Sequence, residues 1–281
     1  SNALIDELKL RVSWGRLGNE SIGQYYAASD ELSLNLYTNF NNTLFPAGAT
    51  TKLANRATSW ETSEQWNAGL DFGLWKSRLS GSVDVFRKTN SDILMQLPVS
   101  GTLGMTTTPY QNAAAMKNTG VEISIGYTGA INEINYRTKI LASHTVSMVA
   151  GLAGRDEIIG GNTILRVGEV YNSFYGLQTE GIYQTTEEIE NHLRMTDENG
   201  QSTNPYMGLV PEPGDIRFKD ITGDGVISND DRALIGKPYP DWIYSATIDL
   251  AWKSWDLGLF FQGVQGVNSL NQGMITAPFH G

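Results

Sequence analysis

The sequence predicts a mainly β protein: an antiparallel meander of hairpins with long loops and one short helix. Apolar and polar residues alternate in several separate stretches, which is the pattern of strands with one apolar face. Glycine is frequent, with 30 residues in 281, and aromatic residues make up 10% of the chain, as suits a sheet-rich protein with many turns. No apolar run approaches the roughly 18 residues that a membrane helix requires.

The first hairpin is predicted between residues 66 and 85. Apolar residues alternate with Asn, Gly and Asp over residues 66–74, and the alternation returns over residues 79–85. The polar tripeptide Lys76-Ser77-Arg78 lies between the two stretches. This arrangement is typical of two antiparallel strands joined by a short turn.

The same alternation recurs over residues 121–127, 242–252 and 255–261. In the last two stretches aromatic residues stand at the strand ends and aliphatic residues lie between them. A lipid-facing band of a membrane barrel has this distribution. A soluble sheet with one buried face produces the same alternation, so both interpretations stay open on the pattern alone.

Polar stretches rich in Gly and Asn separate the predicted strands, at residues 18–58, 99–120 and 150–170. Their length predicts long loops, which commonly carry function. One short helix is predicted at about residues 186–195, because Thr185 and Glu188 form a capping box.

Residues 220–231, DITGDGVISNDD, have the spacing of a calcium-binding loop. Oxygen-bearing residues occupy loop positions 1, 3, 5, 9 and 12, and Gly225 holds position 6, where such loops turn sharply. We therefore expect a structural Ca²⁺ here. Its predicted ligands are the side chains of Asp220, Thr222, Asp224 and Asp231 and the carbonyl of Val226. The alternative is a Gly-Asp turn with solvated acids, since position 12 is Asp rather than the usual Glu.

Composition argues against several classes of function. The formal net charge of -10 argues against a nucleic-acid partner, and the absence of Cys removes thiol catalysis and Cys-based zinc sites. The three histidines, His144, His192 and His280, stand far apart without metal-ligand spacing. No nucleophile elbow or phosphate loop occurs, so no catalytic residue and no cofactor other than calcium is predicted.

Several consecutive motifs together resemble the SusC/RagA type of TonB-dependent receptor. The resemblance covers about residues 8–266. It rests on LKLRVSWGRLGN at residues 8–19, the block from WETSEQWNAGLDFGLW to DILMQL at 60–97, MKNTGVE at 116–122, and the segment from PGDIRFKDITGDG to LFFQGVQ at 213–265. SFYG at residues 173–176 and GIYQ at 181–184 fit the long extracellular loop of that family.

This resemblance implies an outer-membrane importer of Gram-negative bacteria and no catalysed reaction. Such receptors carry oligosaccharides or peptides through a barrel of roughly 22 strands that is closed by a plug. The implied partners are a SusD-like surface lipoprotein, TonB, the lipid of the outer membrane and the glycan or peptide nutrient. No nucleic acid is expected.

Residues 1–3, Ser-Asn-Ala, are typical of the remnant of a cleaved expression tag. Residues 4–281 are expected to form only part of a receptor barrel, with the plug and the terminal strands absent. An open part-barrel exposes strand edges and apolar surface, so we expect it to refold, to oligomerise or to pair its edges when isolated. The alternative function is a soluble extracellular, calcium-stabilised β-sandwich that binds glycan through exposed aromatics such as Trp242 or Trp252.

Overall fold

The computed structural model describes residues 4–20, 30–52, 55, 57–96, 102, 108, 110–197 and 201–271. The chain divides into two compact units. The first contains residues 1–157, 166–170 and 240–265, and the second contains residues 158–165, 171–239 and 266–281. The expected tag remnant at residues 1–3 lies outside the described residues.

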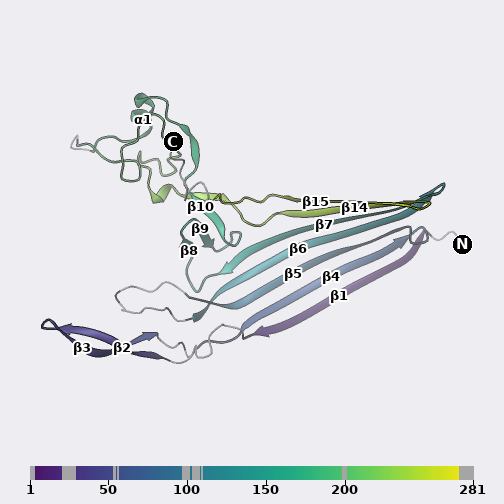
Figure 1. Cartoon of the computed structure of the whole chain (residues 1–281), viewed down its shortest axis with the longest axis horizontal. Coiled ribbons are helices and arrows are strands. Elements are labelled where there is room, and N and C mark those ends of the chain that lie inside the picture. The colour runs from purple at the N-terminus through teal and green to yellow at the C-terminus, as the bar shows by residue number, and fades with distance from the viewer. Residues whose placement is uncertain are drawn as a thin grey trace. The chain divides into compact units, whose positions relative to one another are not determined.

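The first unit is built on a seven-stranded sheet in which each strand pairs with its neighbours in chain order (Figure 1). All of its strand pairs are antiparallel, which confirms the predicted meander of hairpins. In order across the sheet, the strands are β1 (Ile5–Asn19), β4 (Glu61–Leu74), β5 (Leu79–Gln96), β6 (Tyr110–Ile131), β7 (Ile134–Gly151), β14 (Trp242–Trp252) and β15 (Trp255–Gln265).

Short turns close the hairpins β4–β5, β6–β7 and β14–β15 at one end of the sheet, whereas longer connections leave from the opposite end (Figure 1). The short turns use left-handed backbone at Trp75, Lys76, Ser77, Asn132 and Lys253. Tight hairpin turns of the sheet-compatible hand require this positive φ. The turn predicted at residues 76–78 is therefore confirmed, with Trp75 added to it.

Register divides the sheet into an apolar face and a polar face. Leu10 lies opposite Leu70, which lies opposite Val83, and Val83 lies opposite Ile123. Side chains in directly paired positions share a face, so this row continues the apolar face from strand to strand. Leu10 is 75% exposed and Phe261 is 58% exposed. The apolar face is thus open along the described sheet, as a lipid-facing band is.

Aromatic pairs border the apolar face at both ends of the strands. At the end with long connections, the ring centroids of Trp14 and Trp66 are 6.0 Å apart. At the end with short turns, Tyr127 stacks on Tyr136 with centroids 5.8 Å apart, and Trp252 lies opposite Trp255. Aromatic girdles on both sides of an apolar band are the pattern expected of a membrane barrel wall.

The predicted long loops are shorter than expected, because strands occupy part of each. Within residues 18–58, β2 (Glu31–Phe40) and β3 (Thr43–Lys52) form a separate two-stranded sheet. Residues 110–120, expected in a loop, begin β6. Apart from Tyr110 and Met116, their sequence YQNAAAMKNTG carries small and polar side chains on both faces, so the alternation that marks a strand is missing.

The second unit contains short strands. A four-stranded sheet joins, in spatial order, β13 (Ala233–Gly236), β10 (Ser173–Gly176), β9 (Thr163–Arg166) and β8 (Glu157–Gly160). β11 (Thr179–Ile182) pairs with β12 (Ile216–Phe218) in a further sheet. Strands β8 and β9 fall within residues 150–170, which is a further correction to the loop prediction.

The one α-helix among the described residues, α1 (Thr186–His192), starts where the capping box predicts. Thr185 Oγ1 accepts a hydrogen bond from the Glu188 amide at 3.2 Å. The helix ends at His192 rather than near residue 195, because the Arg194 amide donates to Gly225 O at 2.7 Å. None of the described helices is long and apolar enough to cross a membrane.

The helix helps to form the core of the second unit. Tyr183, Ile189, Leu193 and Ile227 are each at most 3% exposed and pack together. Ile227 belongs to the predicted calcium loop, and its amide donates to Pro205 O at 2.6 Å. Core packing therefore anchors one end of that loop.

Candidate functional site on the polar face

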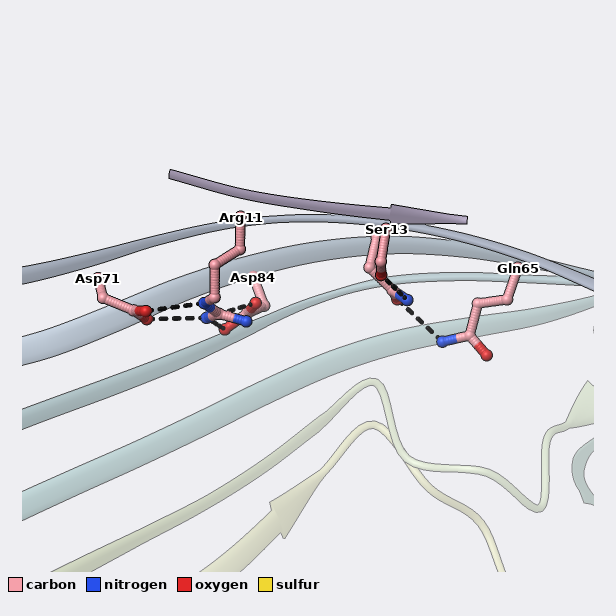
Figure 2. A network of polar contacts seen from close by, with 6 residues as sticks. Arg11, Ser13, Gln65, Asp71 and Asp84 are labelled. Carbon is pink, nitrogen blue, oxygen red and sulfur yellow. Dashed lines mark hydrogen bonds and ion pairs between the residues drawn. The ribbon is translucent and has the colours of Figure 1, made fainter. Parts of the chain in front are cut away.

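A charged cluster on the polar face joins three strands. Arg11 of β1 donates two hydrogen bonds to Asp71 of β4, from Nε to Oδ2 at 2.7 Å and from Nη2 to Oδ1 at 2.8 Å. Nη2 also donates to Asp84 Oδ2 of β5 at 3.0 Å. Figure 2 shows the two carboxylates on either side of the guanidinium. A planar guanidinium that binds one carboxylate through two bonds holds a defined orientation.

Gly69 makes this arrangement possible. It lies on β4 opposite Arg11 on one side and Asp84 on the other. A Cβ placed at Gly69 would collide with Asp84 Oδ1 and would lie 2.8 Å from Arg11 Nη2. The missing side chain thus leaves the space through which Arg11 crosses β4 to reach β5.

A neutral network extends the polar face toward the end with long connections. Asn67 Nδ2 donates to Ser13 Oγ at 3.1 Å, and Gln65 Nε2 donates to Asn67 Oδ1 at 2.9 Å (Figure 2). The network uses alternate positions of β1 and β4, as the strand period requires. Amides and hydroxyls arranged in this way offer donors and acceptors to a polar solute.

The polar face also contains an open hollow of about 490 Å³. Hydroxyls from Ser82, Ser124 and Ser143 line it, as do the neighbouring acids Asp84 and Glu122. Leu141, Ile243 and Phe260 add apolar surface to the same hollow. This combination can bind by hydrogen bonds and apolar contact, and none of the described lining residues forms a nucleophile with a paired base.

The predicted calcium loop is organised by hydrogen bonds to two of its own acids. The Asp231 side chain has no exposed surface. Its Oδ1 accepts from the amides of Ile221 and Thr222, at 2.9 and 3.0 Å, and its Oδ2 accepts from the Ser228 amide at 2.8 Å. At the other end, Asp220 accepts from the amides of Gly223 and Gly225 at 2.6 and 2.8 Å.

The remaining predicted ligands also take part in the loop's own contacts. Thr222 Oγ1 donates to Asp231 Oδ1 at 3.0 Å, and Asp224 Oδ1 accepts from the Val226 amide at 2.8 Å. Gly225 has a φ of +77°, which fits the sharp turn expected at that position. In the described part of the chain, no three His, Cys, Asp or Glu side chains gather as a metal-binding group. Calcium binding therefore stays a prediction.

The histidines are separate from one another where the structure describes them. His144 lies in β7, where its Nδ1 is 2.6 Å from Asp241 O, and His192 ends α1. His192 Nδ1 lies 2.6 Å from the Tyr183 hydroxyl. Burial lowers the pKa of His192, and burial raises the pKa of Tyr183 to about 12, so both stay uncharged at neutral pH. His280 is outside the described residues.

The charged cluster was not predicted, although the alternation pattern contains part of the signal. Alternate polar positions place Arg11 on the polar face of its strand, and Asp71 and Asp84 on the polar faces of theirs. Its contact with Asp84 skips a strand, and only the register together with Gly69 reveals that.

Replacing Gly69 by Ala is expected to separate Arg11 from Asp84, because the new methyl group occupies the crossing space. The melting temperature in detergent should fall by about 2–4 °C, the shift that accompanies the loss of about one moderate interaction. Gly126→Ala is the matched control, since a Cβ there would meet its nearest neighbour at 3.6 Å. Equal shifts for the two variants would contradict this account.

Asp231 is expected to make the second unit sensitive to acid. Burial acts to raise its pKa, but hydrogen bonds from Thr222, Ser228 and Ile221 outweigh burial and hold the pKa below the ordinary 3.8. A lowered folded-state pKa means that the ionised form stabilises the fold above pH 3.8, and that this stabilisation is lost as the pH falls further.

The melting temperature is measured at several pH values between 2.5 and 7. In the unsubstituted chain it should be lower at the most acidic pH values than at pH 7. Asp231→Asn presents an amide to donors that need an acceptor, so it should cost about 1–3 kcal/mol at pH 7 and lose much of the acid dependence. Asp230→Asn, at the exposed neighbouring residue, serves as the control. If the melting temperature of Asp231→Asn depends on pH as strongly as that of the unsubstituted chain, groups other than Asp231 cause the acid sensitivity.

Comparison with known proteins agrees with this two-faced sheet. Residues 3–277 match the family model described as TonB dependent receptor-like, beta-barrel. TonB-dependent receptor P3 of Formosa agariphila is 30% identical over 274 residues, which are 94% of this chain and 26% of that protein. TonB-dependent receptor SusC of Bacteroides thetaiotaomicron is 27% identical over 90% of this chain and 24% of that protein.

Among solved structures, the RagAB peptide transporter superposes with a TM-score of 0.71 at 25% identity. The match covers 95% of this chain and 27% of the transporter chain. The present chain therefore spans about a quarter of the length of the relatives it matches. The family match extends over all the strands that form the seven-stranded sheet, so the chain belongs to the TonB-dependent receptor family and forms part of its β-barrel.

Proposed function

We propose that this chain forms part of the wall of an outer-membrane receptor that imports large nutrients, either oligosaccharides or peptides. The observation that supports the proposal most strongly is the division of one continuous sheet into an exposed apolar face and a polar face. A barrel wall needs an apolar exterior bordered by aromatics and a polar lumen. SusC and the RagAB peptide transporter, to which the chain is similar, are members of such systems.

The polar face supplies the chemistry that the proposed lumen requires. Its hollow combines serine hydroxyls, acids and three apolar side chains, so a solute can exchange hydrogen bonds with water for hydrogen bonds with the wall. The Arg11 cluster braces this wall across three strands. Passage of a solute along this wall requires no catalytic group. The proposed role is therefore that of a transporter and not of an enzyme.

We further propose that the complete receptor works with TonB and with a SusD-like surface lipoprotein. The similarity to SusC and to a RagAB complex supports these partners. The long connections all leave the sheet at one end, where a surface partner would meet the receptor. Affinity purification of the complete receptor should recover such a lipoprotein.

Deleting the gene that encodes this chain is expected to abolish growth of the source bacterium on one class of polymer, while growth on the monomers continues. A panel of oligosaccharides and peptides as sole nutrients measures this. Loss of TonB should reproduce the same growth defect, because both are needed for energised uptake. Normal growth of the deletion strain on every member of the panel would contradict import as the function.

Calcium binding by residues 220–231 is our second proposal. Support comes from the twelve-residue spacing and from the positive φ at Gly225. The ligands proposed are Asp220, Thr222, Asp224, Asp231 and the Val226 carbonyl. An ion would draw carboxylate oxygens of Asp220 and Asp224 away from the amides that they now accept from.

Titrating calcium into the purified protein should raise the melting temperature by several degrees, because a ligand that binds only the folded state stabilises it. Asp224→Asn should remove the effect, whereas Asp230→Asn should leave it unchanged. If neither binding heat nor a thermal shift accompanies calcium in the unsubstituted chain, the loop is a self-bonded turn and does not bind the ion.

A further inference from the structure

A second cluster of charged and aromatic residues lies on the apolar face, at the border nearest the long connections. Arg16 lies opposite Glu64, Glu64 opposite Thr89, and Thr89 opposite Lys117. This row crosses β1, β4, β5 and β6. The next row toward the middle of the sheet contains Trp14, Trp66 and Arg87. We call these six residues the border cluster: Trp14, Arg16, Glu64, Trp66, Arg87 and Lys117.

The single acid of the border cluster already accepts a hydrogen bond from a tryptophan. Trp66 Nε1 donates to Glu64 Oε1 at 3.0 Å. The rings of Trp14 and Trp66 stand 6.0 Å apart beside it. Trp66 thus connects Glu64, through a hydrogen bond, with Trp14, through a ring contact.

The cations of the border cluster outnumber its one carboxylate, Glu64, whose charge interacts with both Arg16 and Arg87. Neither Arg16, Arg87 nor Lys117 forms an ion pair with any residue that the structure describes. Three positive charges and one negative charge leave the cluster with a net charge of about +2. Arg87 is exposed, and its position on β5 is continuous with the apolar residues Val85 and Val83 of the same face.

The place of the border cluster, at the edge of the apolar face, indicates that the anion it binds belongs to a lipid headgroup. The apolar face below the cluster is expected to contact lipid tails, and tryptophans mark the level of lipid headgroups. Guanidinium groups bind phosphate through two parallel hydrogen bonds, which suits Arg16 and Arg87. Three strand spacings separate Arg16 from Lys117, about 14 Å, which is wide enough for a large glycolipid headgroup.

We propose that the border cluster binds a phosphate-bearing headgroup of an outer-leaflet glycolipid, with Arg16, Arg87 and Lys117 contacting phosphate and the Trp14–Trp66 pair seating the headgroup beside the tails. The proposal rests on the proposed place of the apolar face in the membrane. Two observations support it: the positive charge of the cluster is complementary to a phosphate, and the cluster adjoins the apolar band. By this account, Glu64 fixes Trp66 through a hydrogen bond, and its single negative charge leaves a net positive charge on the cluster for the lipid phosphate.

The test uses the complete receptor, purified with bound lipid and washed in detergent that lacks phosphate. Mass spectrometry then measures how much phosphorylated glycolipid stays with the protein. The double substitution Arg16→Gln with Arg87→Gln should lower retention about tenfold, because each lost charge-assisted bond weakens binding. Lys9→Gln with Lys88→Gln is the matched control, since it removes the same charge from β1 and β5 on the polar face.

Retention by the control variant with loss by the border variant supports the proposal, provided that both variants unfold at the temperature of the native receptor. Equal retention by all three proteins overturns it. Two further arms identify the source of the phosphate. Binding of the dephosphorylated glycolipid with unchanged affinity overturns the phosphate contact, and equal retention of a phospholipid that carries no sugar overturns the choice of a glycolipid. Nutrient uptake is measured separately, so failure of import would be seen apart from failure of lipid binding.

Discussion

The in-register antiparallel pairing of seven strands is the constraint on which the rest of the structure depends. Side chains alternate between faces with a period of two, so a slip of one residue at any pairing would exchange the faces of the strand. The register keeps Leu10, Leu70 and Val83 on one face and Arg11 and Asp84 on the other. Both the proposed lipid contact and the proposed lumen follow from this single property.

Small residues let the sheet carry bulky groups without changing this register. Gly69 clears the path of Arg11, and Gly120 faces Phe86 at a distance where a Cβ would lie 2.6 Å from the ring. Glycine inside a strand weakens that strand, but at these two positions it leaves room for a side chain that contacts a neighbouring strand. The polar face is consequently braced by side chains from β1, β4 and β5, in addition to its backbone hydrogen bonds.

The loop at residues 220–231 shows how one sequence pattern supports two physical roles. Asp231 is buried and accepts hydrogen bonds from amides at both ends of the loop, which closes the turn without an ion. The same acids at the same spacing are those that a calcium ion requires. Ile227 anchors the loop in the core with Tyr183 and Leu193, so its shape has a source other than metal coordination.

The sequence by itself determined which residues of each alternating stretch share a face, where the hairpins of residues 66–85 and 242–261 turn, and where α1 begins. These features depend on neighbours along the chain, and motif order also identified the family. Only the tertiary structure decided that residues 110–120 extend β6, that β2 and β3 form a hairpin, and that Arg11 reaches Asp84. The β2–β3 hairpin is local, since only Asn41 and Asn42 join its strands, but Pro46 and Gly48 interrupt the alternation of β3. The other two features depend on pairing between strands separated by long connections. Such pairing is decided by contacts distant in the chain, which local alternation does not encode.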